Sequence, residues 1–245
     1  FQLAFFVQEI CSFANPEGEE RKDVDLLWFP TGGGKTEAYL GLIAFTVGLR
    51  RLSANENDTY NKDGGVTVFL RYTLRLLTTQ QRDRLLKLII AMETIRNSYE
   101  KKGSPVFGTE RISIGFWVGG QLTPNDFTEY KDDFKKKKFM RMVSSQLVKC
   151  PYCGRPLTAD NYHVNTDDET IKIYCSNPDC LYTESKKVSL PVYLVDREIY
   201  RKCPTVIIST VDKFARLPWD EKVGLLFGHT NRKCSRHGYL AVGED

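Results

Sequence analysis

The chain has 245 residues, of which 41% are hydrophobic, so it can bury the core of one large domain or of a domain with a small added module. Its formal net charge of +4 permits a nucleic-acid partner without requiring one. No apolar run approaches the length of a membrane span and no charged-then-apolar leader opens the chain, which excludes a membrane partner and predicts a soluble, cytoplasmic protein. The chain starts without methionine and stops at Asp245, which predicts a piece of a longer protein.

The first thirteen residues carry apolar side chains at positions 3, 6, 7, 10 and 13, a spacing that predicts a helix. Gln2 stands at the head of this helix, beside Phe1. A glutamine amide donates and accepts hydrogen bonds at once and so matches the edge of adenine, which makes Gln2 a candidate for binding a nucleotide base. The alternative is a surface glutamine on a buried helix. A polar loop with Pro16 and Gly18 follows.

The next stretch predicts a strand, a glycine-rich loop and a helix in succession. The apolar run 24–29 predicts the strand, and residues 37–52, apolar nearly all round, predict a buried helix. Adjacent glycines let backbone N–H groups approach an anion, and the helix directs its positive N-terminal end to the same point. The residues expected to bind the nucleotide are Pro30, Thr31, Gly32, Gly33, Gly34, Lys35 and Thr36.

Lys35 and Thr36 are the candidate catalytic residues of this loop. Lys35 would contact the β and γ phosphates of ATP, and the Thr36 hydroxyl would ligate Mg²⁺. The general phosphate-loop pattern has a glycine where this chain has Phe29, but the shorter form Pro-Thr-Gly-x-Gly-Lys-Thr is matched. The alternative is a glycine-rich turn that contains a lysine by chance.

A second strand is predicted at 66–70, and the residues after it suit a nucleic-acid backbone. Arg71, Thr73 and Arg75 carry guanidinium and hydroxyl groups, which pair with phosphate. Ligands of open α/β sheets bind at the carboxyl ends of the strands, where these residues are expected. The alternative is the solvated start of the amphipathic helix predicted at 85–95.

A third strand is predicted at 112–118, and Gly119 and Gly120 close it. A glycine pair here would let a nucleic-acid backbone pass closely, although glycines also end strands for structural reasons alone. Residues 126–138 are strongly charged and include the lysine run 135–138. This run predicts a solvated face, with phosphate tracking as the alternative.

Seven cysteines, four of them in two closely spaced pairs, favour metal binding over a disulfide framework in a protein that uses ATP. Two thiolate pairs on two turns can converge on one tetrahedral Zn²⁺, a closed structural site with no place for His163. The spacer of 21 residues between the pairs and the inner gap of four are slightly longer than the commonest spacing. The expected ligands are Cys150, Cys153, Cys175 and Cys180.

A further buried strand is predicted at 205–210 and leads into the start of a helix. Ser209 and Thr210 end this strand, where a hydroxyl and a helix N-terminus can hold a phosphate of nucleic acid. Close to the end of the chain, Cys234 and His237 have the spacing of half a metal site, whose partners would lie past residue 245.

Taken together, these blocks resemble the large bacterial superfamily 2 helicases typified by the helicase subunit of the DISARM anti-phage system. The order of six blocks carries the resemblance: 1–2, 27–39, 71–81, the cysteine ribbon, 208–214 and 237–239. The resemblance implies that the glycine loop is motif I and that the blocks after the later strands are motifs Ia, Ib and Ic. It also implies ATP-driven engagement of DNA, with a partner subunit, in a bacterial defence complex.

One feature of superfamily 2 is not found in the sequence, namely a strand that ends in Asp-Glu. Its carboxylates hold Mg²⁺ and position the attacking water. The pairs 168–169 and 220–221 follow no apolar strand, and residues 244–245 have the reverse order. We expect this motif and a second RecA-like lobe downstream of Asp245, so the fragment alone is expected to be inactive.

The expected fold class is α/β, a parallel-sheet, RecA-like (P-loop NTPase) lobe with an inserted zinc ribbon. The lobe is expected at 1–143 and 194–245, and the ribbon at 144–193. The expected function of the parent is that of an ATP-dependent DNA helicase or translocase. The first alternative is a zinc-ribbon module that binds nucleic acid or protein and has a vestigial phosphate loop. The second is a phosphate-loop enzyme acting on a small molecule.

Overall fold

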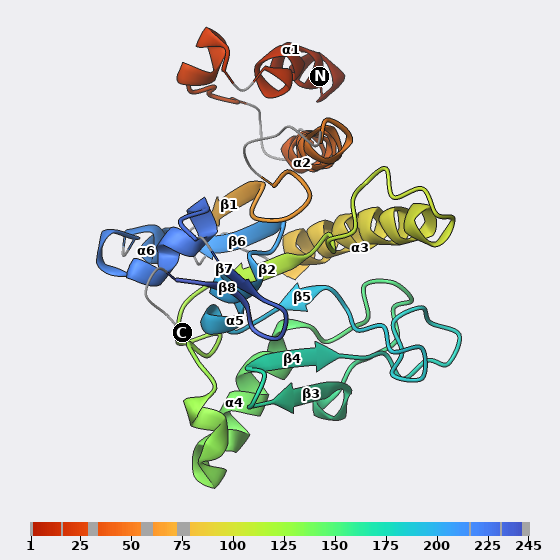
Figure 1. The fold of residues 1–245 in the computed structure, drawn as a ribbon, viewed down its shortest axis with the longest axis vertical. Helices are drawn as coiled ribbons and strands as arrows, with labels where there is room; N and C mark the ends of the chain where they lie inside the picture. Colours follow the sequence, from red (N-terminus) through yellow and green to blue (C-terminus); the bar gives the residue numbers. More distant parts are fainter. Residues whose placement is uncertain are drawn as a thin grey trace.

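A computed structural model describes residues 2–15, 17–28, 34–54, 61–72, 79–215, 217–230 and 232–241 (Figure 1). The α-helices are α1 (Gln2–Ala14), α2 (Lys35–Leu52), α3 (Thr79–Lys101), α4 (Asp133–Gln146), α5 (Asp196–Lys202) and α6 (Val211–Ala215). The strands are β1 (Val68–Tyr72), β2 (Ile114–Trp117), β3 (Tyr162–Asn165), β4 (Thr170–Ile173), β5 (Val192–Tyr193), β6 (Val206–Thr210), β7 (Arg232–Cys234) and β8 (Gly238–Leu240). Short 3₁₀ helices are η1 (Glu19–Lys22), η2 (Thr128–Lys131), η3 (Ala159–Asn161), η4 (Leu217–Trp219) and η5 (Glu221–Phe227).

The centre of the fold is a four-stranded parallel sheet with the strand order β1-β6-β2-β5. All five residues of β6 are buried, which explains its apolar run, because a strand covered on both faces has no solvent side to make polar. Ile208 of β6 lies between Leu70 of β1 and Phe116 of β2. The predicted α/β class with a parallel sheet is confirmed, and it is compatible with a RecA-like lobe.

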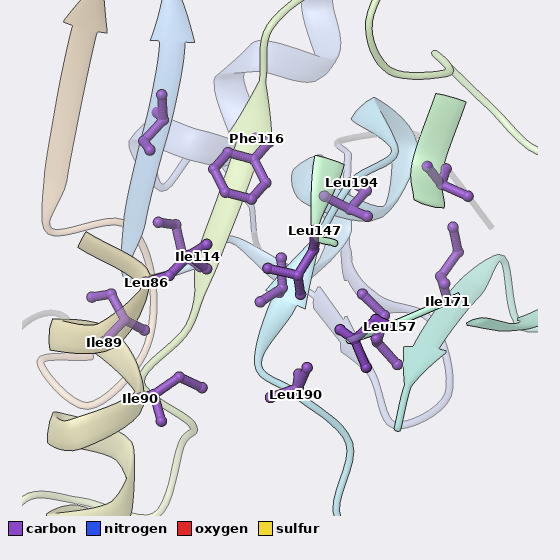
Figure 2. Close-up of a cluster of buried hydrophobic side chains, with 14 of the residues drawn as sticks. Leu86, Ile89, Ile90, Ile114, Phe116, Leu147, Leu157, Ile171, Leu190 and Leu194 are labelled. Carbon is purple, nitrogen blue, oxygen red and sulfur yellow. The ribbon is translucent and has the colours of Figure 1, made fainter. Parts of the chain in front are cut away.

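Helix α3 packs against the sheet through a buried face. Leu86 and Ile89 are almost fully buried and point toward Ile114 of β2 (Figure 2). Glu93 continues the same face at helical spacing, and its Oε2 accepts the backbone N–H of Ile112 at 2.8 Å. Apolar burial of this kind contributes about 25 cal/mol per Å², and the hydrogen bond fixes the helix to the strand it covers.

The predicted zinc ribbon shares this core. Leu157, Ile171 and Leu190, all within the predicted insertion, belong to the same buried cluster as the side chains of α3 and β2 (Figure 2). Strand β5, at the end of the predicted insertion, pairs with β2 as the fourth strand of the main sheet. A strand of two residues has no alternation that a sequence pattern could reveal, so this pairing was not expected.

The strand predicted at 24–29 is wrong over its described part, residues 24–28. These residues form no strand, and the side chains of Val24, Leu26 and Trp28 are 95%, 86% and 86% exposed. A strand needs a neighbouring strand to pair its backbone groups. Here the neighbour is helix α1, since residues 25–28 line one groove together with Ala4, Phe5 and Gln8 of that helix, and β1 is the outer strand of the described sheet.

Other expectations are met in part. Helix α1 matches the predicted N-terminal helix, whereas α2 is less buried than expected, since Tyr39 and Leu52 are 38% and 58% exposed. The lysine run 135–138 lies on an exposed stretch of α4.

Figure 1 shows α1 and α2 at one end of the sheet and α4 with the β3–β4 hairpin at the other. Within the described ranges, none of the helices has both the length and the apolar character needed to cross a membrane.

Candidate metal centre and the carboxyl edge of the sheet

Four thiols gather in one cluster on the ribbon. The sulfur atoms of Cys150, Cys153, Cys175 and Cys180 all lie within 4.8 Å of one another. The Sγ–Sγ distance is 3.8 Å between Cys150 and Cys180 and 3.5 Å between Cys153 and Cys175. Thiolates at about 2.3 Å from a tetrahedral zinc ion stand about 3.8 Å apart, so this cluster could hold a metal ion such as zinc.

Tight turns of the backbone position these sulfurs. The N–H of Gly154 donates to the carbonyl of Cys150 at 2.8 Å, and Gly154 has a φ of 77°, which a glycine adopts without strain. The second turn is closed by the N–H of Cys175, which donates to the carbonyl of Tyr182 at 2.7 Å. The N–H of Tyr182 in turn donates to Sγ of Cys180 at 3.4 Å, a contact that favours a thiolate.

The thiols differ in acidity. Burial raises the pKa of Cys180 to about 11 and also raises the pKa of Cys150. Burial acts to raise the pKa of Cys153 as well. Hydrogen bonds from the backbone of Arg155 and from neighbouring groups outweigh this effect and lower the pKa to about 7. Cys153 is thus the thiol most ready to bind a cation at neutral pH, and the buried thiols would release protons on binding. Because three of the four sulfur-bearing residues are buried, the arrangement suits a closed, structural centre.

Gln2, Gly34, Lys35 and Thr36 are the described members of the predicted nucleotide site, while residues 30–33 lie outside the described part of the chain. Lys35 and Thr36 form the first turn of α2, directly after Gly34, whose φ of 78° is left-handed. The side chain of Gln2 lies against Gly34. The structure therefore brings Gln2, the first residue of α1, to the start of α2, and the two helices pack together.

The first turn of α2 lies close to two parallel strands, β1 and β6. Thr36 lines a small cavity of about 10 Å³ together with Tyr72, the last residue of β1, and Ile208 of β6. Such a cavity has room for about one water molecule, so a nucleotide would have to lie outside it. An ion pair between Glu37 of α2 and Arg84 of α3 joins this turn to the neighbouring helix.

Three of the residues predicted to contact nucleic acid, Arg71, Ser209 and Gly119, lie in or shortly after neighbouring strands. Arg71 of β1 is in register with Ser209 of β6, which is in register with Trp117 of β2. Arg71 is exposed, and its guanidinium lies 5.1 Å from the centre of the Phe214 ring. Gly119 follows β2 with a φ of 99°. These positions share the carboxyl edge of the sheet.

The other predicted contacts differ in their access to solvent. Gly120 is exposed, but Ser209 and Thr210 are 0% and 2% exposed, and the Ser209 hydroxyl has no hydrogen-bond partner among the described residues. Neither side chain can reach a phosphate unless the residues covering it move. Thr73 and Arg75 lie outside the described residues.

The Cys234–His237 pair sits on the β7–β8 hairpin, with Sγ and Nδ1 3.6 Å apart. Across the described ranges, the four-cysteine cluster is the one group of three or more Cys, His, Asp or Glu side chains placed to hold a metal. The pair on the hairpin therefore has no third ligand there. His163 is exposed and lies 3.3 Å from Glu184 rather than joining the cysteines.

The same edge carries a buried ion pair that no sequence motif predicts. Asp196 at the start of α5 is 3% exposed and pairs with Lys213 of α6. Burial raises the pKa of Asp196 to about 6, in spite of the opposing charge of Lys213. The ammonium of Lys213 also lies 5.7 Å from the centre of the Trp117 ring. No motif links an Asp and a Lys seventeen residues apart, so only the fold reveals this group.

No family model matches the chain. Over 254 aligned residues that include all of this chain, it is 52% identical to DISARM protein DrmA of Bacillus paralicheniformis (strain ATCC 9945a / NCIMB 11709 / CD-2). The chain spans 22% of the length of that protein. The predicted resemblance to a DISARM component is thus confirmed: this chain is similar, along its whole length, to one segment of DISARM protein DrmA.

Proposed function

We propose that this chain is the ATP-binding lobe of a superfamily 2 DNA helicase or translocase. In this proposal, the protein that contains it couples ATP hydrolysis to movement on DNA in anti-phage defence. The observation that carries the proposal is the first turn of α2, where Lys35 and Thr36 follow a left-handed glycine beside the parallel strands β1 and β6. The 52% identity to DISARM protein DrmA supports the defence context and a partner subunit in a defence complex.

The described half of the nucleotide site fits ATP and Mg²⁺ in its chemistry. The N-terminus of α2 offers backbone N–H groups and a partial positive charge to a phosphate. Lys35 would contact the β and γ phosphates, the Thr36 hydroxyl would hold Mg²⁺, and Gln2 would read adenine. Mg²⁺, when bound, neutralises the charge that develops on the phosphates.

DNA would follow the carboxyl edge of the sheet. Arg71 is exposed at the end of β1, and Lys213 reaches over Gly119 at the end of β2, where an added Cβ would be 3.9 Å from Lys213 Cε. Cations at this edge would pair with phosphates, and the glycines would let the backbone approach closely. The zinc ion proposed for the four-cysteine cluster would stabilise the ribbon and, through the shared core, β5 and α4.

Nucleotide binding tests this proposal most simply. In the full-length protein, ATP with Mg²⁺ is expected to raise the midpoint of thermal unfolding, because a ligand that binds only the folded state stabilises it. Lys35→Ala is expected to remove the shift without changing the midpoint of the free protein. An unchanged shift in this variant would contradict the assignment of Lys35.

A second candidate function is a zinc-ribbon module that binds nucleic acid or protein and has a vestigial phosphate loop. It is favoured by one observation: residues 24–28 do not join the sheet, whereas the cysteine cluster is complete. This candidate predicts no thermal shift with ATP and Mg²⁺, together with DNA or protein binding that depends on the cysteines.

A further inference from the structure

A cleft of about 580 Å³ opens at the carboxyl edge of the sheet, between the end of β2, the start of α5 and the η4–η5 connection. Cavities of this size commonly bind small organic groups. None of its lining residues belongs to the glycine loop or the cysteine cluster. Six of the lining side chains determine its chemistry: Trp117, Asp196, Tyr200, Lys213, Trp219 and Asp220.

The inner wall of the cleft is held by a chain of hydrogen bonds. The indole N–H of Trp117 donates to the hydroxyl of Tyr200 at 3.2 Å, and this hydroxyl donates to Oδ2 of Asp220 at 2.9 Å. The backbone N–H of Lys222 donates to the other oxygen of Asp220 at 3.1 Å. Trp117 and Tyr200 are buried, so the position of the Asp220 carboxylate is fixed before any ligand arrives.

Asp196 supplies an acceptor that lacks a donor. Its side chain is 5% exposed, and Oδ2 pairs with Lys213. Oδ1 has almost no exposed surface and accepts no hydrogen bond from any described residue, so a ligand donor would reach it once the residues that cover it shift. A buried carboxylate oxygen without a partner costs about 1–3 kcal/mol, so a ligand group that donates to it would bind favourably.

The mouth of the cleft is formed by an indole that faces solvent. Trp219 is 85% exposed, although tryptophan buries more apolar area than most side chains when it packs. An exposed indole beside fixed carboxylates suits a flat, heteroaromatic ligand that stacks on the ring and donates hydrogen bonds from its edge. Exocyclic amino groups of nucleobases are such donors, and carboxylates accept from them.

We propose that this cleft holds one unstacked, amino-bearing nucleobase of a DNA strand, stacked on Trp219 with its amino edge toward Asp196 and Asp220. The inference rests on the proposed function, because the strand would be the one that crosses the carboxyl edge. Lys213 connects the cleft with the proposed path of the strand, since it lines the cleft and also lies over Gly119. The cleft would then hold a base out of the stack while the backbone follows the strand ends.

The test measures the affinity of the full-length protein for a single-stranded oligonucleotide, intact or with one abasic site placed at successive positions. Trp219→Ala is expected to weaken binding of the intact strand about tenfold, a typical effect of losing one base–aromatic stack. At one position, the abasic site should weaken binding by the wild type by the same factor and leave binding by Trp219→Ala unchanged. Trp219→Phe should keep most of the affinity, because it keeps a flat ring.

Two further variants separate this inference from the proposed function. Trp28→Ala removes an indole that is 86% exposed but lies beside α1, and it should leave binding unchanged. Arg71→Ala should weaken the binding of intact and abasic strands alike. If Arg71→Ala weakens binding and Trp219→Ala does not, the base pocket is overturned and the DNA edge stands. If no strand binds at all, both proposals fail. A free nucleotide that binds at Trp219 more tightly than the strand would also overturn the assignment.

Discussion

The side-chain amide of Gln2 lies directly against Gly34, so closely that a Cβ atom on Gly34 would stand 2.0 Å from Gln2 Nε2. Helix α1 therefore reaches the glycine that precedes Lys35, although more than thirty residues separate the two in sequence. Helices α1 and α2 are also joined by the edge-to-face rings of Phe6 and Phe45, whose centres are 5.5 Å apart. The contact between Gln2 and Gly34 thus joins the two described parts of the proposed nucleotide site, the start of α1 and the start of α2.

Gly34→Ala is expected to lower the free energy of unfolding by about 2 kcal/mol, because a side chain is strained at a φ of 78° and also meets Gln2. The same change should displace Gln2 and weaken ATP binding. Urea denaturation measures the first effect and titration calorimetry the second.

Gly48→Ala provides the matched control within the same helix. Nothing lies within 4 Å of a Cβ added at Gly48, so alanine should stabilise α2 by up to about 1 kcal/mol and leave ATP binding unchanged. Equal stability of Gly34→Ala and the wild type would show that the contact with Gln2 is not formed in solution.

Zinc should be found at about one ion per chain, bound by the four cysteines. Cys175→Ser is expected to abolish this content and to lower the midpoint of thermal unfolding by about 5 °C or more, since metal binding to such a cluster contributes directly to folding. Elemental analysis and thermal denaturation measure the two effects.

Cys11→Ser is the control for the metal, because Cys11 is exposed on α1 and outside the cluster. It should keep the metal and the unfolding midpoint of the wild type. A purified wild-type protein with no zinc, or a Cys175→Ser protein with full zinc content, would count against the centre.

Stability should fall as the pH rises from about 5 to 8, chiefly because of one buried carboxyl group, since the contribution of Asp196 ends near pH 6. Glu198 of α5 is 1% exposed, and burial raises its pKa from 4.5 to about 8, although the N–H of Ile171 and the charge of Lys202 act in the opposite direction. The folded state therefore keeps a proton that the unfolded state has lost, so unfolding becomes easier across this interval.

Glu198→Gln should remove this dependence above about pH 6, since the amide is neutral at every pH and its oxygen can still accept the N–H of Ile171. The variant and the wild type are expected to be about equally stable at pH 5. At pH 8 the variant should be more stable, by on the order of 1–3 kcal/mol. Parallel pH profiles for the two proteins would rule out a neutral Glu198 in the fold.

Periodicity and spacing predicted the parts of this fold that follow local rules. The apolar run of β6 identified a central strand, and the two cysteine pairs identified four thiols that lie together. The strand predicted from the run 24–28 is wrong, because apolar content alone does not determine whether a strand or a helix lies beside the run. The Asp196–Lys213 pair and the cleft around it arise only when α5 and α6 meet at the edge of the sheet.

The most direct test of the account is the rate of ATP hydrolysis by the full-length protein, with and without DNA. DNA is expected to stimulate hydrolysis, and Lys35→Ala is expected to lower the rate at least about 100-fold, because this change removes a phosphate contact and no core atom. The variant should unfold at the same urea concentration as the wild type. Hydrolysis that DNA does not stimulate would favour a phosphate-loop enzyme that acts on a small molecule. Turnover at the wild-type rate by Lys35→Ala would contradict the proposed ATP-binding lobe itself.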